Sequence, residues 1–160
     1  VTVRDLEKRL PQLDRAWIEA NTTPIDDRTD YQRKTLALSD TLIAEIEAAD
    51  TLIIGVALCN FSIPASLKLW IDLVCRAGKT FAYSEGKPKG LMTGKKAIVC
   101  FASGGTPFGS DIDFASAYIR HILGFIGITD VTFIAADKRF KDDQTLTRAD
   151  AAVDALIGQL

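Results

Sequence analysis

The chain has few of the residues from which catalytic and metal sites are usually built. Its 160 residues include one histidine, His121, and three cysteines, Cys59, Cys75 and Cys100, which form no Cys-x-x-Cys pair. This pattern predicts neither a zinc site nor a disulfide framework. The motifs G-x-S-x-G, H-E-x-x-H and G-x-G-x-x-G do not occur, so there is no evident protein nucleophile. If the chain is an enzyme, we expect a bound cofactor to supply its chemistry.

A strong excess of charge of one sign is also missing. There are 19 Lys and Arg residues against 21 Asp and Glu, which gives a formal net charge of -2. Nucleic acids and anionic membranes are bound by clustered basic residues, so neither partner is predicted. No apolar run approaches the roughly 20 residues of a membrane-spanning helix, and no signal segment opens the chain. We therefore expect a soluble, cytoplasmic protein.

What the chain does contain is a regular alternation of apolar and amphipathic segments. Residues 51–57, 97–101 and 131–135 are apolar at nearly every position, which is typical of parallel strands covered on both faces. Val1–Asp5 is predicted as a further short strand. Amphipathic helices are expected from Thr29 or Asp30 to about Ala49, from Pro64 to near Gly78, over 114–126 and around 149–157, with a loop or short helix over 11–28 and a surface segment over 81–93.

This order of elements, without hairpin turns, predicts an α/β fold: a three-layer, doubly wound parallel sheet with the flavodoxin-like strand order. The length and an apolar fraction of 48% predict one domain over residues 1–160.

In such sheets, ligands bind beyond the carboxyl ends of the strands. The segments Leu58–Phe61 and Ala102–Gly105 follow two of the predicted strands directly. The pair Gly104 and Gly105 would allow a planar ligand to approach backbone N–H groups. A plain turn explains the glycine pair equally well on this segment alone.

The residues after the first long apolar run closely resemble a segment of the FMN-dependent NADH azoreductases, which belong to the flavodoxin-like NAD(P)H quinone reductases. The matching residues are Asn60-Phe61-Ser62-Ile63-Pro64, Leu67-Lys68, Trp70-Ile71-Asp72 and Arg76-Ala77-Gly78-Lys79-Thr80-Phe81, with further matches at Gly90-Leu91, 93–97 and 123–131. The resemblance extends over essentially the whole chain and is densest from Asp50 to Val131.

The resemblance implies non-covalent FMN at the carboxyl edge of the sheet, and two-electron, ping-pong reduction of quinones and azo compounds by NADH or NADPH. It implies that Leu58, Cys59, Asn60 and Phe61 line the isoalloxazine ring, and that Ala102, Ser103, Gly104 and Gly105 meet its pyrimidine end. It also implies a homodimer with active sites near the subunit interface. Phe81 and Tyr83 are expected to form the substrate pocket, unless they merely pack their own segment.

Three departures from the family pattern motivate an alternative. Cys59 stands where relatives have tyrosine, and Pro107 stands where many have histidine or tyrosine. The chain also starts at what resembles the family's second strand, so we expect the first strand and the phosphate loop to be missing, with Val1–Asp5 and Thr51–Ala57 flanking the gap. The alternative is a flavodoxin-like binding or scaffold protein that has lost tight flavin binding. A one-electron carrier fits less well, since such carriers are usually strongly acidic.

Overall fold

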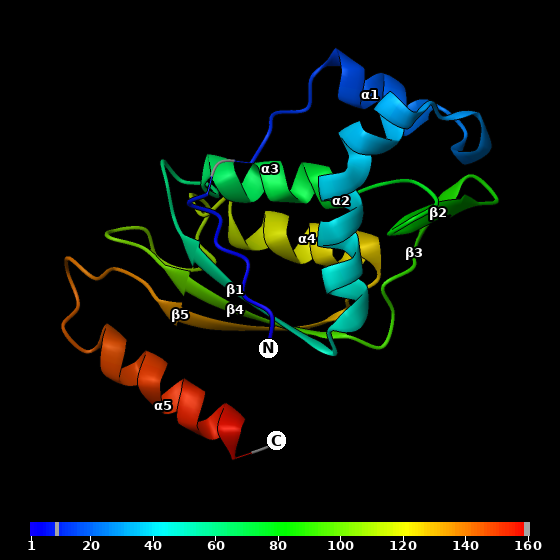
Figure 1. The fold of residues 1–160 in the computed structure, drawn as a ribbon. Helices are drawn as coiled ribbons and strands as arrows, with labels where there is room; N and C mark the ends of the chain where they lie inside the picture. Colours follow the sequence, from blue (N-terminus) through cyan, green and yellow to red (C-terminus); the bar gives the residue numbers. More distant parts are fainter. Residues whose placement is uncertain (9, 159–160) are drawn as a thin grey trace.

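A parallel sheet of three strands lies at the centre of the computed structural model, which describes residues 1–8 and 10–158. Strands β1 (Thr51–Ala57), β4 (Lys96–Ala102) and β5 (Asp130–Ala136) are arranged in the order β1-β4-β5 (Figure 1). In the register of the sheet, Ala57 lies opposite Ala102, and Ala102 lies opposite Ala136. All three strands therefore end at the same level, and each covers one of the three apolar runs predicted as strands.

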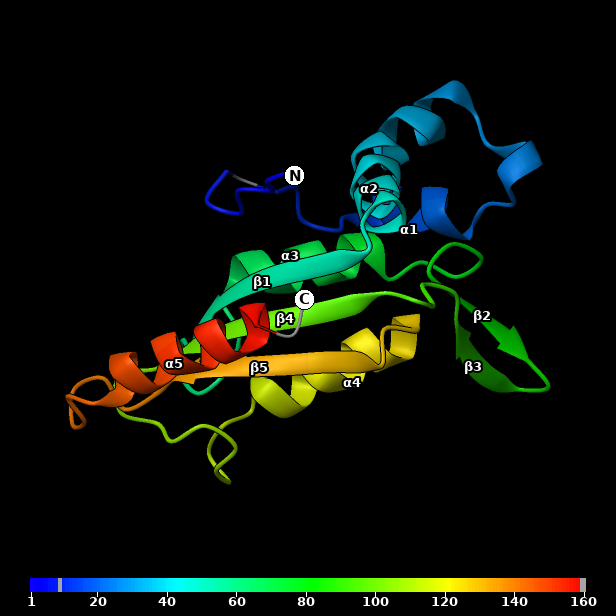
Figure 2. The same ribbon diagram turned by 90° about the horizontal axis from the view of Figure 1, so that it is seen from below.

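Helices cover both faces of this sheet. α3 (Ala65–Val74) and α4 (Ser116–Ile126) lie over one face, and α5 (Thr145–Ile157) lies over the other (Figure 2). α2 (Asp30–Ala48) packs against α3, and α1 (Arg15–Thr22) packs against α2; the short 3-10 helix η1 (Ile25–Asp27) connects α1 to α2. This is the predicted layered arrangement.

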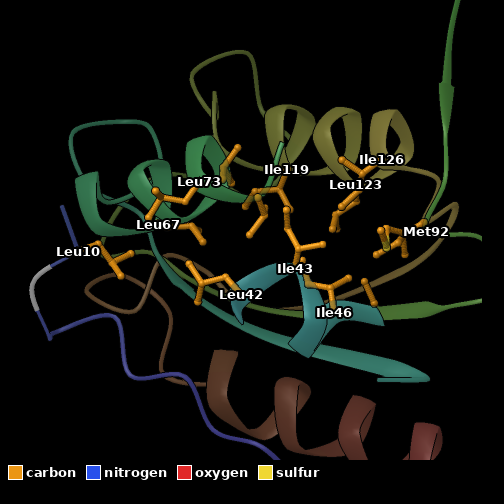
Figure 3. Close-up of a cluster of buried hydrophobic side chains, with 14 of the residues drawn as sticks. Leu10, Leu42, Ile43, Ile46, Leu67, Leu73, Met92, Ile119, Leu123 and Ile126 are labelled. Carbon is orange, nitrogen blue, oxygen red and sulfur yellow. The ribbon is translucent and has the colours of Figure 1, made fainter. Parts of the chain in front are cut away.

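Local sequence signals explain where these helices begin and end. The Thr29 hydroxyl accepts a hydrogen bond from Gln32 N, and the Gln32 side chain accepts one from Thr29 N. This capping box starts α2, as predicted. Gly127, with φ +107°, ends α4 in the left-handed conformation, which glycine adopts without steric cost. Apolar side chains from α2, α3 and α4 meet between these elements and form the core, including Leu42, Ile43, Ile46, Leu67, Leu73, Ile119, Leu123 and Ile126 (Figure 3).

The segment predicted as a surface connection contains a hairpin. β2 (Phe81–Ser84) and β3 (Lys87–Gly90) pair in antiparallel fashion as a separate two-stranded sheet. Their turn consists of Glu85 and Gly86, with φ values of +53° and +75°, which is typical of tight hairpins. The expectation that the chain has no hairpin turn was wrong, because β3 is polar and carries no alternating apolar signal.

Two predicted boundaries also differ from the structure. Val1–Asp5 is not a strand: Val1 and Val3 are exposed, and the Arg4 guanidinium pairs with the Glu45 carboxylate of α2. A strand needs a hydrogen-bonding neighbour, and these residues have none among the described part of the chain. α3 ends at Val74 rather than near Gly78.

The outer edge of β1 has no hydrogen-bonded strand beside it among residues 1–8 and 10–158. Ile53, on β1, is 72% exposed. Val1–Asp5 therefore does not flank a gap in the sheet as a parallel strand. The missing first strand and phosphate loop stay predictions, as does a single domain over residues 1–160.

Candidate functional site

Three loops lie side by side where the parallel strands end (Figure 1). They follow β1, β4 and β5, and backbone hydrogen bonds connect each to its neighbour. Leu58 N donates to Ala102 O at 2.8 Å, and Ser103 N donates to Ala136 O at 3.2 Å. The predicted segments Leu58–Phe61 and Ala102–Gly105 are thus brought together.

The loop after β1 is a tight turn held by its own backbone. Cys59 N donates to Ser62 O at 2.8 Å, and Ser62 N donates to Cys59 O at 3.0 Å. Between them, Asn60 and Phe61 have φ values of +47° and +70°. A left-handed phenylalanine is unusual and costs about 1–2 kcal/mol. Strain of this kind is often found at binding sites.

The loop after β4 is positioned by Ser103, whose side chain is almost fully buried. Its hydroxyl donates to Thr106 O and accepts from Lys138 N. Both the hydroxyl and the amide of Ser103 are therefore used inside the protein. Gly104 and Gly105 follow it, and neither has a positive φ. Gly104 is required for lack of space, because a β-carbon there would come within 2.4 Å of the Phe140 ring, whereas a β-carbon on Gly105 would have room.

Four backbone N–H groups of these two loops indicate a binding site for a planar ligand with a polar edge. The amides of Asn60, Phe61, Gly104 and Gly105 donate to no protein acceptor among the described residues. The Phe61 side chain is 52% exposed beside them. Backbone N–H groups held in rigid loops can donate hydrogen bonds directly to the polar edge of a heterocycle. The loops therefore fit the isoalloxazine ring of a flavin.

Phe81 and Tyr83 lie elsewhere in the chain. They belong to the hairpin between α3 and β4, which lies at the amino end of the sheet, opposite the three loops (Figures 1 and 2). Phe81 packs on Phe125 of α4 with ring centroids 4.4 Å apart, whereas Tyr83 is 67% exposed. Within one chain, the structure does not bring these two residues to the other predicted site residues.

The loop after β5 lies against the loop after β4, and sequence reasoning did not include it in the candidate site. Arg139 N donates to Ser103 O at 3.0 Å, and Phe140 N donates to Gly104 O at 2.9 Å. Residues 137–141 directly follow the third apolar run. Their position at a strand end was therefore the signal that could have identified them.

Asp113 holds together the segment that leads from the β4 loop into α4. Its carboxylate accepts from Gly109 N at 2.9 Å, from Ala115 N and Ser116 N at 3.0 Å each, and from the Ser116 hydroxyl at 2.6 Å. The same segment reaches the β1 loop, since Phe114 N donates to Phe61 O at 3.0 Å. Burial on its own raises the pKa of the Asp113 carboxyl, but these hydrogen bonds outweigh it and leave the pKa below its usual value.

Replacing Asp113 with asparagine is expected to lower the free energy of unfolding by about 1–2 kcal/mol at pH 7. Because the folded pKa is depressed, the carboxylate stabilises the fold above the unfolded pKa, and this contribution is lost as pH falls through the folded value. Urea unfolding of both proteins between pH 7 and pH 3 measures the difference, which should shrink below about pH 4. Asp111→Asn, at an exposed neighbour, is the control. A constant difference across this range would contradict the assignment.

Replacing Phe61 with glycine is expected to weaken ligand binding at the loops without destabilising the fold. Glycine adopts φ +70° freely, which offsets its larger entropy in the unfolded chain. The free energy of unfolding should change by less than about 1 kcal/mol. Phe61→Leu, which keeps an apolar side chain and the strain, is the matched control. Thermal unfolding checks the prediction, and a glycine variant destabilised more than the leucine variant would contradict it.

Comparisons with known proteins show the family of this chain. A protein family described as having the flavodoxin-like fold matches residues 1–157. An FMN-dependent NADH:quinone oxidoreductase 1 from Jannaschia sp. (strain CCS1) is 59% identical over 157 residues, which cover 98% of this chain and 82% of that protein. A protein of the same description from Hahella chejuensis is 53% identical over 91% of this chain and 72% of its own length.

Two solved structures share the fold of this chain. The crystal structure of an azoreductase from Bacillus anthracis str. Sterne matches with a TM-score of 0.82 and 28% identity, over 95% of this chain and 76% of that one. An FMN-dependent NADH-azoreductase from Bacillus anthracis str. Ames Ancestor, solved in complex with FMN, shares the fold with a TM-score of 0.83 at 24% identity, over 98% and 78% of the two chains. Among the described residues, no helix is both long enough and apolar enough to cross a membrane.

Proposed function

Because the chain belongs to the family with the flavodoxin-like fold, we propose that it is an FMN-dependent oxidoreductase that uses NADH to reduce quinones and azo compounds by two electrons. The observation that carries this function is the pair of loops with four amides that have no protein acceptor among the described residues. The names of the relatives, FMN-dependent NADH:quinone oxidoreductase and azoreductase, support it. They favour NADH over NADPH, and they do not favour a scaffold protein without flavin.

The residues of the two loops would bind and orient the flavin. Bound FMN supplies the hydride chemistry, accepting two electrons from NADH and passing them to the acceptor. The amides of Gly104 and Gly105 and of Asn60 and Phe61 would donate to the polar atoms of the ring, where negative charge increases on reduction. The Phe61 side chain would cover the ring and exclude water. Leu58 and Ala102 hydrogen-bond to each other and hold the two loops together.

Cys59 and Pro107 do not remove these donors. Cys59 is exposed, and its backbone is hydrogen-bonded with Ser62 in both directions. Pro107 O accepts from Ser110 N and from the Ser110 hydroxyl, so this residue forms part of the turn before α4.

We also propose that the protein is a homodimer and that it is located in the cytoplasm. α3 and α4 present half-exposed apolar side chains, among them Trp70, Tyr118 and Ile122. A two-fold axis perpendicular to the strands would place the hairpin of one subunit at the carboxyl edge of the other subunit's sheet. Phe81 and Tyr83 would then contribute to the substrate pocket of the partner. Three cysteines without a disulfide in the described chain are compatible with a reducing compartment.

The visible spectrum of the purified protein tests the cofactor, followed by NADH oxidation with a quinone and with an azo dye as separate acceptors. We expect flavin absorption bands, release of FMN on denaturation, and quinone-dependent NADH oxidation with ping-pong kinetics. A protein that neither retains nor binds added FMN would refute the function and favour the scaffold alternative.

Light scattering combined with a Tyr83→Ala variant tests the shared site. We expect a dimer at micromolar concentration and a raised KM for the quinone, with unchanged FMN content. Tyr31→Ala, at an exposed tyrosine on α2, is the matched control. A fully active monomer would exclude a pocket shared between subunits.

A further inference from the structure

The loop after β5 carries a concentration of positive charge that the proposed flavin site does not use. Residues 138–141, here called the basic loop, read Lys-Arg-Phe-Lys in a chain whose net charge is -2. Among the described residues, no salt bridge involves Lys138, Arg139 or Lys141. Arg139 and Lys141 are exposed, and Lys138 is half-buried. Asp137, Asp142 and Asp143 flank the loop, but the Asp137 carboxylate accepts from Phe108 N and the Asp142 carboxylate pairs with Arg148. The three cations of the loop are therefore not paired with these two carboxylates and are available to an anionic ligand.

The basic loop is fixed along its length against the loop after β4, residues 102–105, here called the glycine loop. Lys138, Arg139 and Phe140 donate their backbone N–H groups to Ser103 Oγ, Ser103 O and Gly104 O at 3.2, 3.0 and 2.9 Å. Lys141 N donates back to Lys138 O at 2.7 Å, and this closes the turn. The backbone of the basic loop is therefore fixed so that its three cationic residues lie at the edge of the proposed flavin site.

Phe140 adds an aromatic face to this charge. Its side chain is 89% exposed, although it lies so close to Gly104 that a β-carbon there would overlap the ring. Burial in the core therefore does not explain its presence. An exposed aromatic ring among Lys and Arg side chains has the chemistry of a nucleotide site, since bases stack on aromatic faces and phosphates bind cations.

We propose that the basic loop binds the adenosine diphosphate half of NADH, an inference that rests on the proposed function. The nicotinamide must meet the flavin ring between the first two loops, so the remainder of the dinucleotide extends to the rim. There, Phe140 stacks on the adenine, and Lys138, Arg139 and Lys141 bind the pyrophosphate. The loop thereby favours a dinucleotide donor over a donor that lacks the pyrophosphate and the adenine.

Steady-state kinetics with two electron donors test this assignment. NADH and reduced nicotinamide riboside share the reacting ring, but the riboside lacks the pyrophosphate and the adenosine. In the double variant Lys138→Gln/Lys141→Gln, we expect KM for NADH to rise by about tenfold, while KM for the riboside and kcat stay unchanged. Phe140→Leu should raise KM for NADH in the same selective way. Lys34→Gln, at an exposed lysine of α2, is the control and should change neither KM.

Calorimetric titration with ADP gives a readout that does not depend on turnover. The unmodified protein should bind ADP, more weakly as salt is raised, and the double variant should bind it about tenfold more weakly. Equal changes of KM for both donors, or ADP binding unaffected by the double substitution, would overturn the inference. So would a selective rise of KM for a sulfonated azo dye or a loss of FMN, which would assign the cations to the acceptor or to the cofactor phosphate. Absence of any flavin-dependent NADH oxidation in the unmodified protein would refute the proposed function instead.

Discussion

Replacing Arg76 with methionine is expected to lower the free energy of unfolding by about 3 kcal/mol. The Arg76 side chain is only 1% exposed and joins three separate parts of the chain. Its Nη1 donates to Ser39 Oγ at 3.0 Å and to Asp40 Oδ1 at 2.7 Å, and its Nε donates to Asn21 Oδ1 at 3.0 Å. Methionine fills a similar volume but donates nothing, so these acceptors lose charge-assisted hydrogen bonds.

Urea unfolding of the two proteins measures this effect. Arg33→Met is the matched control, because Arg33 lies on the surface of α2, 3.6 Å from Asp30 and 55% exposed. Exposed ion pairs contribute less than about 1 kcal/mol, so this substitution should have little effect. Equal stability changes for the two variants would show that Arg76 does not hold α1, α2 and the end of α3 together.

Replacing Gly104 with valine is expected to weaken FMN binding by about a hundredfold, equivalent to roughly 3 kcal/mol. The new β-carbon would lie 2.4 Å from the Phe140 ring, so either the ring or the glycine loop must move. Any movement of the loop misplaces the amides of Gly104 and Gly105. FMN retained after gel filtration and fluorescence titration of the flavin-free protein measure the loss.

The neighbouring glycine provides the control for this prediction. The nearest neighbour of a β-carbon on Gly105 would be the flexible Lys141 side chain, at 3.9 Å. Gly105→Ala should therefore retain FMN much better than Gly104→Val. A Gly104→Val/Phe140→Ala double variant should recover binding, because the obstacle is the aromatic ring. Full FMN retention in Gly104→Val would exclude the glycine loop from the site.

The layers of the fold could be predicted from the sequence because their signals are local. A run such as 97–101 is apolar at consecutive positions, and Thr29 with Gln32 starts α2 through contacts within one turn. The helix and strand order then determined which two loops lie at the carboxyl edge. The family resemblance agreed with this placement and added the cofactor.

Features that depend on distant partners could not be predicted in this way. Arg76 is at the motif that carries the resemblance, but its buried role depends on Asn21 and Ser39, far away in the sequence. The contribution of Phe140 depends on the absence of a side chain at Gly104. The hairpin that carries Tyr83 was missed because charged residues and a proline make up most of β3.

The three strands end at the same level, but the loops that follow them contribute different groups to the proposed site. The loops after β1 and β4 contribute mainly backbone groups, and the loop after β5 contributes side chains. Because Ala57, Ala102 and Ala136 lie in one row, the first two loops present peptide groups whose chemistry is the same whatever residue occupies the position. Apart from Phe61, whose side chain would cover the ring, substitutions there act mainly through the conformation of the loop. The loop after β5 is different, because its side chains carry the charge. On the proposed assignment of the basic loop, exchanging its four residues should alter donor preference, while the part of the site proposed for the flavin ring stays intact.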